Sequence, residues 1–411
     1  MKSLVVVCVF VLTAVYFLWR TFLPALTSMT HSYPAYYTAS RLIVEGRWSA
    51  QVYDDHWFEA RVLEMTQGRV SDHFSLHPPT TSLLLVPLAW LDLTTARVLW
   101  QLFNLVLLGA ALGLLVSALG MYSVVPRLVF FSFALLYPPL AENIRVGQSY
   151  VMLLFLFALA LWSELRGKPF ITALGLGLAA GIKLSGAPLW LVLAARREWR
   201  VLLWSIGVAC ASALVGLGAL GWEGWLAFFK RVVDYSQPVP LAAHVAFQTT
   251  PSFFQRMFVA SSEFNPTPLF DAPLLAPLVN FGLVALALGT MLWYARRAAL
   301  EFAFAAAVTC GVILFPMAAE YHYTLLFIPL AVMSAHIWNT RHRVEALWLG
   351  VILILLYVPF DWNAPRWSTR EWMLLAYPRL YAGWLLWLWL LKQMWQERAP
   401  AGVRWPSSAI P

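Results

Sequence analysis

Thirteen apolar stretches separated by polar segments run through this chain, and they constrain its fold more than any other feature. They cover residues 3–23, 79–91, 96–119, 128–140, 149–162, 170–182, 184–195, 201–222, 273–294, 298–317, 323–337, 346–360 and 380–394. A membrane-spanning helix needs about 20 mainly apolar residues. Several stretches are shorter, and such short or broken helices are tolerated at membrane depth where they line a protein cavity. The pattern predicts an all-α polytopic membrane protein.

The composition supports the same class. Of 411 residues, 61% are hydrophobic and 12% are charged, whereas soluble domains have about 45–50% apolar and about 25% charged residues. These values exclude a soluble domain, a disordered chain and a nucleic-acid-binding module. The formal net charge of +8 then reports mainly on membrane topology, because basic residues concentrate in cytoplasmic loops.

The basic residues predict the topology. Basic clusters follow apolar stretches near Arg166, Arg197, Arg296, Arg341 and Lys392, and the positive-inside rule places them in the cytoplasm. The long loops 24–78 and 223–272 then lie outside. We expect both termini in the cytoplasm and about twelve crossings, with stretch 79–91 or 128–140 re-entrant or not fully spanning.

We expect one membrane domain over residues 1–396, followed by a disordered Pro-rich tail over 397–411. Stretch 3–23 is long for a signal peptide and precedes no clear cleavage site, so we interpret it as a retained first helix.

The first outer loop contains two amphipathic helix patterns. One covers residues 36–44 and ends at Gly46, and the second begins at Asp54-Asp55 and stops near Gly68. Aspartates suit the N-cap and the first turn of a helix. We expect the apolar faces of these helices to lie on the membrane surface.

Lys183 is the most informative polar residue, because ionisable groups within membrane segments are costly and mark functional sites by default. It stands between two short apolar runs, with glycines at 181 and 186 and a proline at 188. This pattern predicts a helix break that presents an ammonium group to a cavity, where phosphate is a natural ligand. The ordinary alternative is a lysine that snorkels from a helix end.

Two polar islands face the outer side in this topology. The segment 142–148 offers Glu142 as a base, Arg145 as a phosphate ligand and Gln148 as a hydrogen-bond partner for a sugar. The second island contains His322, which can donate, accept or carry charge near neutral pH. A surface Glu–Arg pair and a structural histidine between aromatic residues are the ordinary alternatives.

No motif indicates a metal or a cofactor. The histidines and aspartates of the first loop match no tight metal-ligand spacing. The three cysteines lie inside apolar stretches and form no CxxC pair, so they support neither a disulfide framework nor a thiolate site. We therefore expect no metal and no cofactor.

The polar islands together resemble the pattern of glycosyltransferase family 87, within the GT-C superfamily. The matching pieces occur in the family's order over most of the first 330 residues: Tyr36-Tyr37-Thr38-Ala39 followed by a glycine and Tyr53, Pro78-Pro79, Gly147-Gln148, Ile182-Lys183 with Pro188 and Arg196-Arg197 downstream, and His322-Tyr323.

The resemblance implies a GT-C fold with an active site on the outer face of the plasma membrane. The donor would be a polyprenyl-phosphate sugar, typically polyprenyl-phosphate-mannose, and the acceptor a lipid-linked or other glycan. Transfer would invert the anomeric carbon: a carboxylate would take the acceptor proton, and Lys183, which matches the family's lysine, would stabilise the leaving phosphate.

One position departs from the family pattern. An aspartate usually precedes the Tyr-Tyr pair, and Ser32 occupies that place here. As substitute bases we consider Asp54 and Asp55 first and Glu142 second, and His31 could also accept a proton. We assign Ser32, Tyr36, Tyr37, Gln148 and His322 to sugar or acceptor binding.

Two other functions remain open at this point. A lipid or glycan flippase would need no base and would explain Ser32, although such transporters often contain inverted repeats and none is visible here. A non-catalytic GT-C relative could also serve as a scaffold.

Overall fold

The computed structural model describes residues 2–74, 76–236, 240–362 and 364–396. Within these ranges the chain forms helices and loops without a β-strand, apart from one isolated bridge between Ser261 and Asn265. This confirms the all-α fold class. The predicted tail, 397–411, lies outside the described residues.

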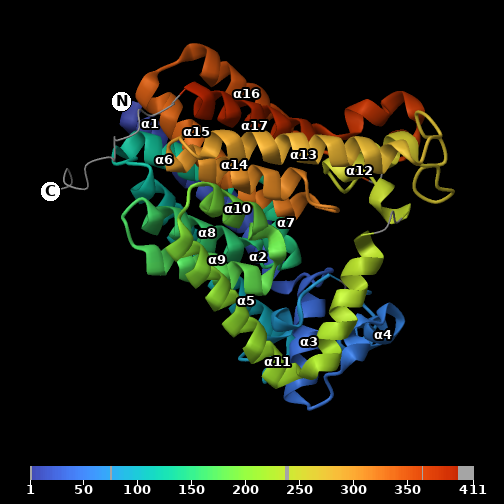
Figure 1. The fold of residues 1–411 in the computed structure, drawn as a ribbon. Coiled ribbons are helices and arrows are strands. Elements are labelled where there is room, and N and C mark those ends of the chain that lie inside the picture. Colours follow the sequence, from blue (N-terminus) through green and yellow to red (C-terminus); the bar gives the residue numbers. More distant parts are fainter. Residues whose placement is uncertain (1, 75, 237–239, 363, 397–411) are drawn as a thin grey trace.

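The helices follow one another with few long connections (Figure 1). The α-helices are α1 (Lys2–Phe17), α2 (Leu23–Thr27), α3 (Tyr33–Val44), α4 (Asp55–Met65), α5 (Leu93–Ala118), α6 (Val124–Leu135), α7 (Pro138–Val146), α8 (Tyr150–Glu164), α9 (Pro169–Ile182), α10 (Ala187–Ala195), α11 (Trp199–Ser236), α12 (Thr250–Phe258), α13 (Leu275–Ala295), α14 (Leu300–Ile313), α15 (Phe327–Thr340), α16 (Arg343–Tyr357) and α17 (Pro378–Gln396). The 3₁₀ helices that matter below are η3 (Pro79–Leu83), η4 (Leu184–Gly186) and η6 (Glu320–Leu326).

Four helical segments of the described chain are long and apolar enough to cross a membrane, or six if each of two bent pairs is one span. The four are Ser3–Thr27, Leu93–Ala118, Trp199–Asp234 and Leu275–Ala295. The first of them confirms that the predicted stretch 3–23 is helical. Several remaining apolar helices are shorter than a full span, and the count of about twelve crossings stays a prediction.

The two stretches that the topology singled out are both irregular. Stretch 79–91 contains only η3, followed by turns. Stretch 128–140 falls on α6 and α7, which are bent by 52° at their junction. Neither is a straight helix. The bent pair α6 and α7 is either a broken span or a re-entrant loop, and which of the two stretches does not cross the membrane fully stays a prediction.

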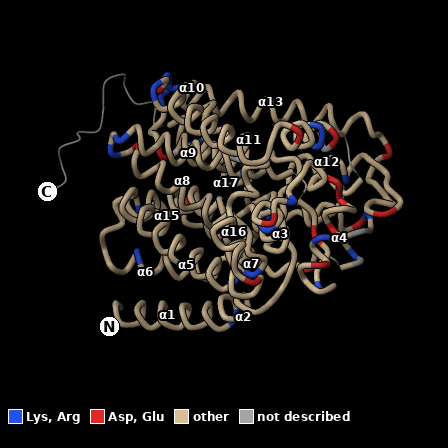
Figure 2. The backbone as a smooth tube through the Cα atoms, turned by 90° about the horizontal axis from the view of Figure 1, so that it is seen from below, with Lys and Arg blue, Asp and Glu red and all other residues tan. Residues whose placement is uncertain are grey.

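The predicted basic loops gather at one end of the molecule. Nη1 of Arg196 donates to the carbonyl oxygens of Ala295 and Ala298, both at 2.8 Å, and Nη2 of Arg166 donates to Ser117 Oγ at 2.9 Å. These contacts join the ends of α5, α8, α10 and α13. We call this the basic end; α1 begins there, and α3, α4 and α12 lie at the opposite, loop end (Figure 2).

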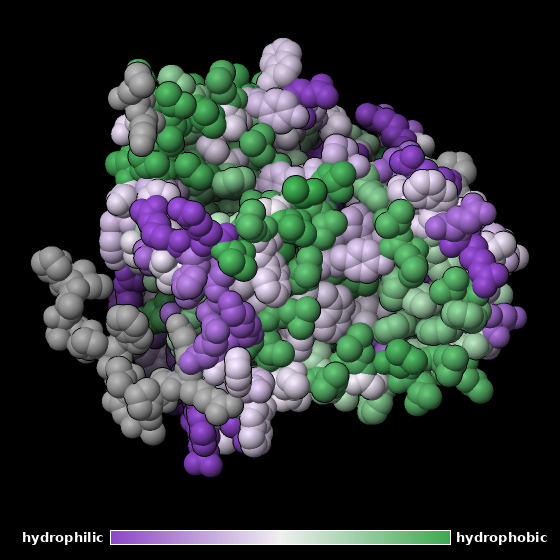
Figure 3. All heavy atoms as spheres, turned by 90° about the horizontal axis from the view of Figure 1, so that it is seen from above, coloured by the Kyte–Doolittle hydropathy of each residue, from purple (hydrophilic) through white to green (hydrophobic). Residues whose placement is uncertain are grey.

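Apolar side chains cover much of the outer surface. On the face shown in Figure 3, hydrophilic residues form patches at the left, at the upper edge and along the right edge, and hydrophobic residues are interspersed with residues of intermediate hydropathy between these patches. Exposed side chains of this kind include Leu214, Leu286 and Leu347 on three different helices. Because large exposed apolar surfaces mark contact with partners or lipid, this surface fits a bilayer environment.

The first outer loop confirms one prediction and overturns another. The helix α4 begins as predicted, with the Asp54 carboxylate accepting from the amide of Trp57 at 3.0 Å. The helix α3 also forms and ends before Gly46. It does not lie on the membrane surface, however: Tyr33 through Ser40 are all buried, because its aromatic and small residues pack against η3 and α5. The helical pattern in the sequence did not show that other segments of the chain would pack against both faces of this helix.

Candidate active site

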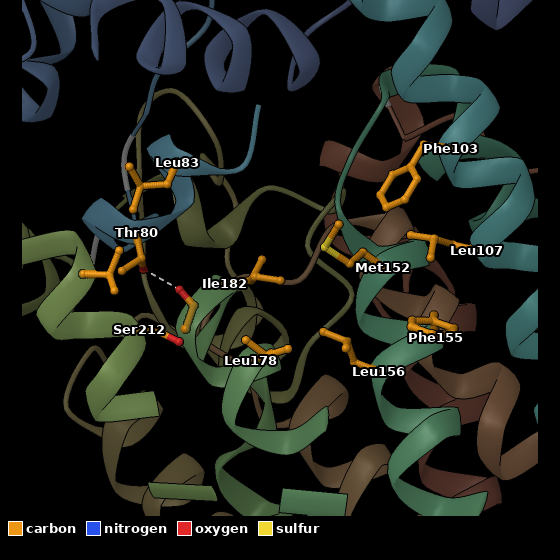
Figure 4. Close-up of a pocket in the computed structure, with 12 residues that line it drawn as sticks. Thr80, Leu83, Phe103, Leu107, Met152, Phe155, Leu156, Leu178, Ile182 and Ser212 are labelled. Carbon is orange, nitrogen blue, oxygen red and sulfur yellow. Dashed lines mark hydrogen bonds between the residues drawn. The ribbon is translucent and has the colours of Figure 1, made fainter. Parts of the chain in front are cut away.

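Lys183 lies at the tip of a helical hairpin. The helix α9 runs from the basic end to Ile182, Lys183 takes an extended conformation, and α10 returns after η4. The end of α9 is held by η3, where the Thr80 hydroxyl donates to the Gly181 carbonyl and the Thr81 hydroxyl to the Ile182 carbonyl at 2.9 Å; the Thr80 bond is dashed in Figure 4. These bonds satisfy carbonyls that the helix end leaves open and fix the position of the lysine.

The ammonium group of Lys183 is buried without a carboxylate partner. Its Nζ donates to Gln148 Oε1 at 3.0 Å and lies 4.3 Å from the ring centroid of Tyr150 and 5.9 Å from that of Tyr36. The side chain is 8% exposed. Among ion pairs between described residues, none includes Lys183. An amide oxygen and two ring faces hold the cation without neutralising it, so it can still bind an anion.

Gln148 is placed by a turn that requires glycine. The helix α7 ends at Gly147, whose φ of +70° lies in the left-handed region. A Cβ atom there would stand 2.8 Å from Cβ of Tyr33, closer than real contacts allow. The Gly147 carbonyl in turn accepts from Trp100 Nε1 at 2.9 Å. The predicted Gly147-Gln148 pair is therefore needed to bring the amide to Lys183.

Tyr36 joins the same group from α3. Its hydroxyl donates to Gln148 Oε1 and lies 3.4 Å from Ser149 Oγ. Its ring centroid is 5.0 Å from that of His77, one of the first-loop histidines that the sequence analysis considered only as metal ligands and did not assign to a sugar site. Burial, together with the charge of Lys183, holds the pKa of His77 well below its ordinary value, so this ring is neutral at pH 7.

His322 completes the group from η6. Its ring centroid lies 4.5 Å from that of Tyr150 and 4.7 Å from that of Tyr321. Its Nδ1 is buried and has no hydrogen-bond partner among the described residues. Because a buried polar atom without a partner costs free energy, this nitrogen is available for a ligand. Tyr36, His77, Gln148, Tyr150, Lys183, Tyr321 and His322 are called the Lys183 cluster below.

Other predicted site residues have partners outside this cluster. Glu142 and Arg145 form an ion pair at 2.6 Å, in which the arginine side chain is half exposed. Asp54 caps α4, and the Asp55 carboxylate pairs with Arg231. The Tyr37 hydroxyl donates to the Leu91 carbonyl at 2.7 Å. The structure thus brings together Tyr36, Gln148, Lys183 and His322, and the roles given to the other residues stay predictions.

Ser32 lies at an unusual turn before α3. Its φ is +84°, rare for a residue with a side chain. Its amide donates to Oδ2 of Asp72 at 2.5 Å, and a second oxygen of this carboxylate accepts from the amide of His73 at 2.9 Å. Asp72 comes from the segment between α4 and η3. Nothing in the sequence pattern links it to Ser32, since forty residues separate the two.

An apolar cavity of about 460 Å³ adjoins the end of α9. Figure 4 shows two walls, one with Thr80, Leu178, Ile182 and Ser212 and the other with Phe103, Leu107, Met152 and Phe155. Ile182 precedes Lys183 directly, so the cavity reaches the chain segment that carries the ammonium group. Phe103 and Val215, which also line it, are exposed on the outer surface. The cavity therefore opens to the apolar outer surface of the molecule.

Two curated relatives are similar to this chain over about seven tenths of its length. The polyprenol-phosphate-mannose-dependent alpha-(1-2)-phosphatidylinositol mannoside mannosyltransferase of Mycobacterium tuberculosis is 23% identical over 304 residues, which are 69% of this chain and 68% of the relative. The protein of the same name from Mycolicibacterium smegmatis is 25% identical over 321 residues, 72% of this chain and 69% of the relative. No solved structure matches this chain significantly.

The model of glycosyltransferase family 87 matches residues 76–319. This range covers more than half of the chain and contains η3, Gly147-Gln148 and Lys183, which build the cluster. It stops just before His322. The chain therefore belongs to glycosyltransferase family 87.

Proposed function

We propose that this protein transfers a hexose, with mannose as the expected sugar, from a polyprenyl-phosphate donor to a lipid-linked or glycan acceptor, with inversion of the anomeric carbon. The observation that carries this proposal is the buried, unneutralised ammonium group of Lys183 next to an apolar cavity. A donor with one phosphate between a sugar and a long hydrocarbon chain matches this arrangement: the sugar would face the polar residues of the cluster, the phosphate would face Lys183, and the hydrocarbon chain would lie in the apolar cavity.

The phosphate of the donor binds Lys183. When the bond between the anomeric carbon and the phosphate oxygen breaks, negative charge grows on the leaving polyprenyl phosphate. A cation already in place stabilises that charge without reorganisation. Gln148 and the ring of Tyr150 hold Nζ in position, so the ammonium group meets the phosphate at a defined point.

The hydrocarbon chain of the donor occupies the cavity lined by Leu178, Ile182 and Phe155. This places the sugar on the polar side of Lys183, beside Gln148, Tyr36 and His322. The hydroxyl of Tyr36 and the unpartnered nitrogen of His322 are suited to bind sugar hydroxyls. No metal or cofactor is part of the proposal.

The site would open at the outer face of the plasma membrane, with both termini in the cytoplasm. The basic end of the molecule supports this orientation, because basic loops favour the cytoplasmic side. The names of the two relatives give a phosphatidylinositol mannoside as their acceptor, which makes this class of glycolipid the first acceptor to test here.

The test is transfer of labelled mannose from polyprenyl-phosphate-mannose to a phosphatidylinositol mannoside by the purified protein in detergent. We expect a new labelled glycolipid and release of polyprenyl phosphate. Lys183→Ala should lower the rate by about 30-fold or more, because losing a charge-assisted contact costs about 2 kcal/mol or more. Movement of the donor across a bilayer without its cleavage would contradict the proposal.

Lys168→Ala is the matched control. Lys168 directly precedes α9, and its Nζ lies 4.9 Å from the ring centroid of Trp162, so it shares the residue type and the aromatic contact of Lys183. It lies at the basic end, and its loss should leave transfer unchanged. Equal losses in both variants would show that Lys183 acts only through stability.

A further inference from the structure

Asp72 is a carboxylate without a cationic partner in the described part of the chain. Both of its oxygens accept backbone amides, from Ser32 and His73, and none of the ion pairs between described residues includes it. Its side chain has intermediate exposure, so the protein surrounds much of it while part of its surface stays accessible. An ionised carboxylate offers about four lone-pair sites, so two amide contacts leave acceptor capacity.

This carboxylate lies beside the Lys183 cluster. It interacts electrostatically with the hydroxyl groups of Tyr36 and Tyr321. The Tyr36 hydroxyl also contacts Gln148, which holds the ammonium of Lys183. Tyr36 is therefore both within the electrostatic reach of Asp72 and hydrogen-bonded to the amide that holds Lys183. A sugar bound against Gln148 and Tyr36 would have the phosphate-binding group and the carboxylate within reach.

The other acidic candidates are already engaged. Asp54 caps α4, Asp55 pairs with Arg231, and Glu142 pairs with Arg145. Asp72 has no such cation to compete for its proton-accepting oxygens. Burial raises the pKa of Asp72 above its ordinary value, against the lowering effect of the Ser32 and His73 amides and of the nearby His31 and His73 rings. A carboxylate with a raised pKa is a stronger proton acceptor.

We propose that Asp72 is the general base of the sugar transfer; this inference rests on the proposed function. The acceptor hydroxyl oxygen forms a bond to the anomeric carbon, and its proton passes to the carboxylate of Asp72. The bond from the anomeric carbon to the phosphate oxygen breaks, and its electron pair leaves with the polyprenyl phosphate at Lys183.

The experiment compares transfer and product binding in Asp72→Asn. Loss of a general base lowers the rate by about 10²–10⁴-fold, whereas binding of polyprenyl phosphate, which depends on Lys183, should not change. Lys183→Ala should weaken both. Asp54→Asn, Asp55→Asn and Glu142→Gln test the three carboxylates that the sequence offers as alternative bases, and a loss of transfer in any of them as large as that in Asp72→Asn would overturn this inference. If the wild-type protein transfers no sugar, the proposed function fails; if it does and Asp72→Asn transfers equally well, only this inference fails.

Two measurements separate a base from a structural contact. Asp92→Asn is the control, because the Asp92 carboxylate also accepts two backbone amides, from Thr94 and Thr95 at 3.0 Å, and its loss should leave transfer intact. The second measurement is rescue: formate added to Asp72→Ala, or the double variant Ser32→Asp with Asp72→Asn, supplies a carboxylate at nearly the same place.

Recovery of transfer by either rescue supports the proposal. It is overturned if neither rescue restores transfer, or if Asp72→Asn loses polyprenyl phosphate binding together with transfer.

Discussion

The two ends of the molecule use positive charge in different ways. At the basic end, Arg196 donates to two backbone carbonyls, and Lys392 pairs with Glu345 at 2.9 Å. At the tip of the α9–α10 hairpin, Lys183 contacts a neutral amide and two aromatic rings. Arg196 and Lys392 at the basic end contact acceptor groups that are charged or backbone carbonyls, whereas Lys183 forms no ion pair with a described residue.

From this difference we predict which substitutions should affect stability and which should affect activity. Removing a cation at the basic end takes away contacts that join helix ends. Removing Lys183 or its partner takes away a binding group and leaves most of the helix packing unchanged. The three experiments below test this division.

The largest expected effect is an all-or-none difference in accessibility between the two ends. Asp54→Cys and Arg197→Cys, each in a chain without its native cysteines, place single thiols at exposed positions of the loop end and the basic end. A membrane-impermeant maleimide added to intact cells should label position 54 and leave position 197 unlabelled until the cells are permeabilised. The reverse pattern would invert the proposed topology.

Two buried glutamines, one at each end of the molecule, test the same difference between binding and stability. Gln148→Leu removes the oxygen that holds Lys183, and a hydrogen bond to a charged group contributes about 1.5–3 kcal/mol, so transfer should fall by about 10–150-fold. Gln393, whose Nε2 donates to Glu345 at 2.8 Å at the basic end, is the control. Gln393→Leu should lower thermal stability but leave the rate per folded molecule near normal. A similar fall in rate would mean that the ends are not separable.

The smallest expected effect concerns Arg196. Arg196→Met keeps the length of the side chain but loses both donations to the carbonyls of Ala295 and Ala298. We expect the free energy of unfolding to drop by about 1–3 kcal/mol, measured as a lower midpoint of thermal unfolding in detergent. The rate per folded molecule should stay unchanged, and a loss of rate without a loss of stability would contradict the comparison.

Local signals identified Lys183 and Gln148 of the Lys183 cluster, and the family resemblance added Tyr36 and His322. A charge between two apolar runs with flanking glycines identified Lys183, and the pair Gly147-Gln148 stood out between apolar helices. Both signals are local. A charged residue between apolar runs can be recognised from its immediate neighbours, and the left-handed turn at Gly147 requires a glycine at that one position. The cap of α4 at Asp54 was predictable for the same reason.

The remaining cluster residues, and Asp72 outside the cluster, depend on contacts between distant segments. Asp72 and His77 lie in a segment without periodicity, and only the packing of α3 against η3 and α5 brings them to Tyr36. In the sequence Tyr150 looks like an ordinary interfacial aromatic residue, and only the fold brings its ring centroid to 4.3 Å from Nζ of Lys183. The burial of α3 was not predicted for the same reason, since the periodicity of a helix does not show how many of its faces are packed against distant segments.

The length of α9 limits how far Lys183 can lie from the start of that helix. Its 14 residues span at most about 21 Å at about 1.5 Å per residue, while the hydrocarbon core of a bilayer is about 30 Å thick. In the proposed topology, with α9 starting at the cytoplasmic boundary of the core, Lys183 would lie below the opposite boundary, where Thr80 and Thr81 of η3 hold the end of α9. Under the proposed function, the phosphate of the donor would then have to move inward to reach this lysine. Turnover would therefore depend on bilayer thickness, with thinner membranes bringing the headgroup and the ammonium group closer.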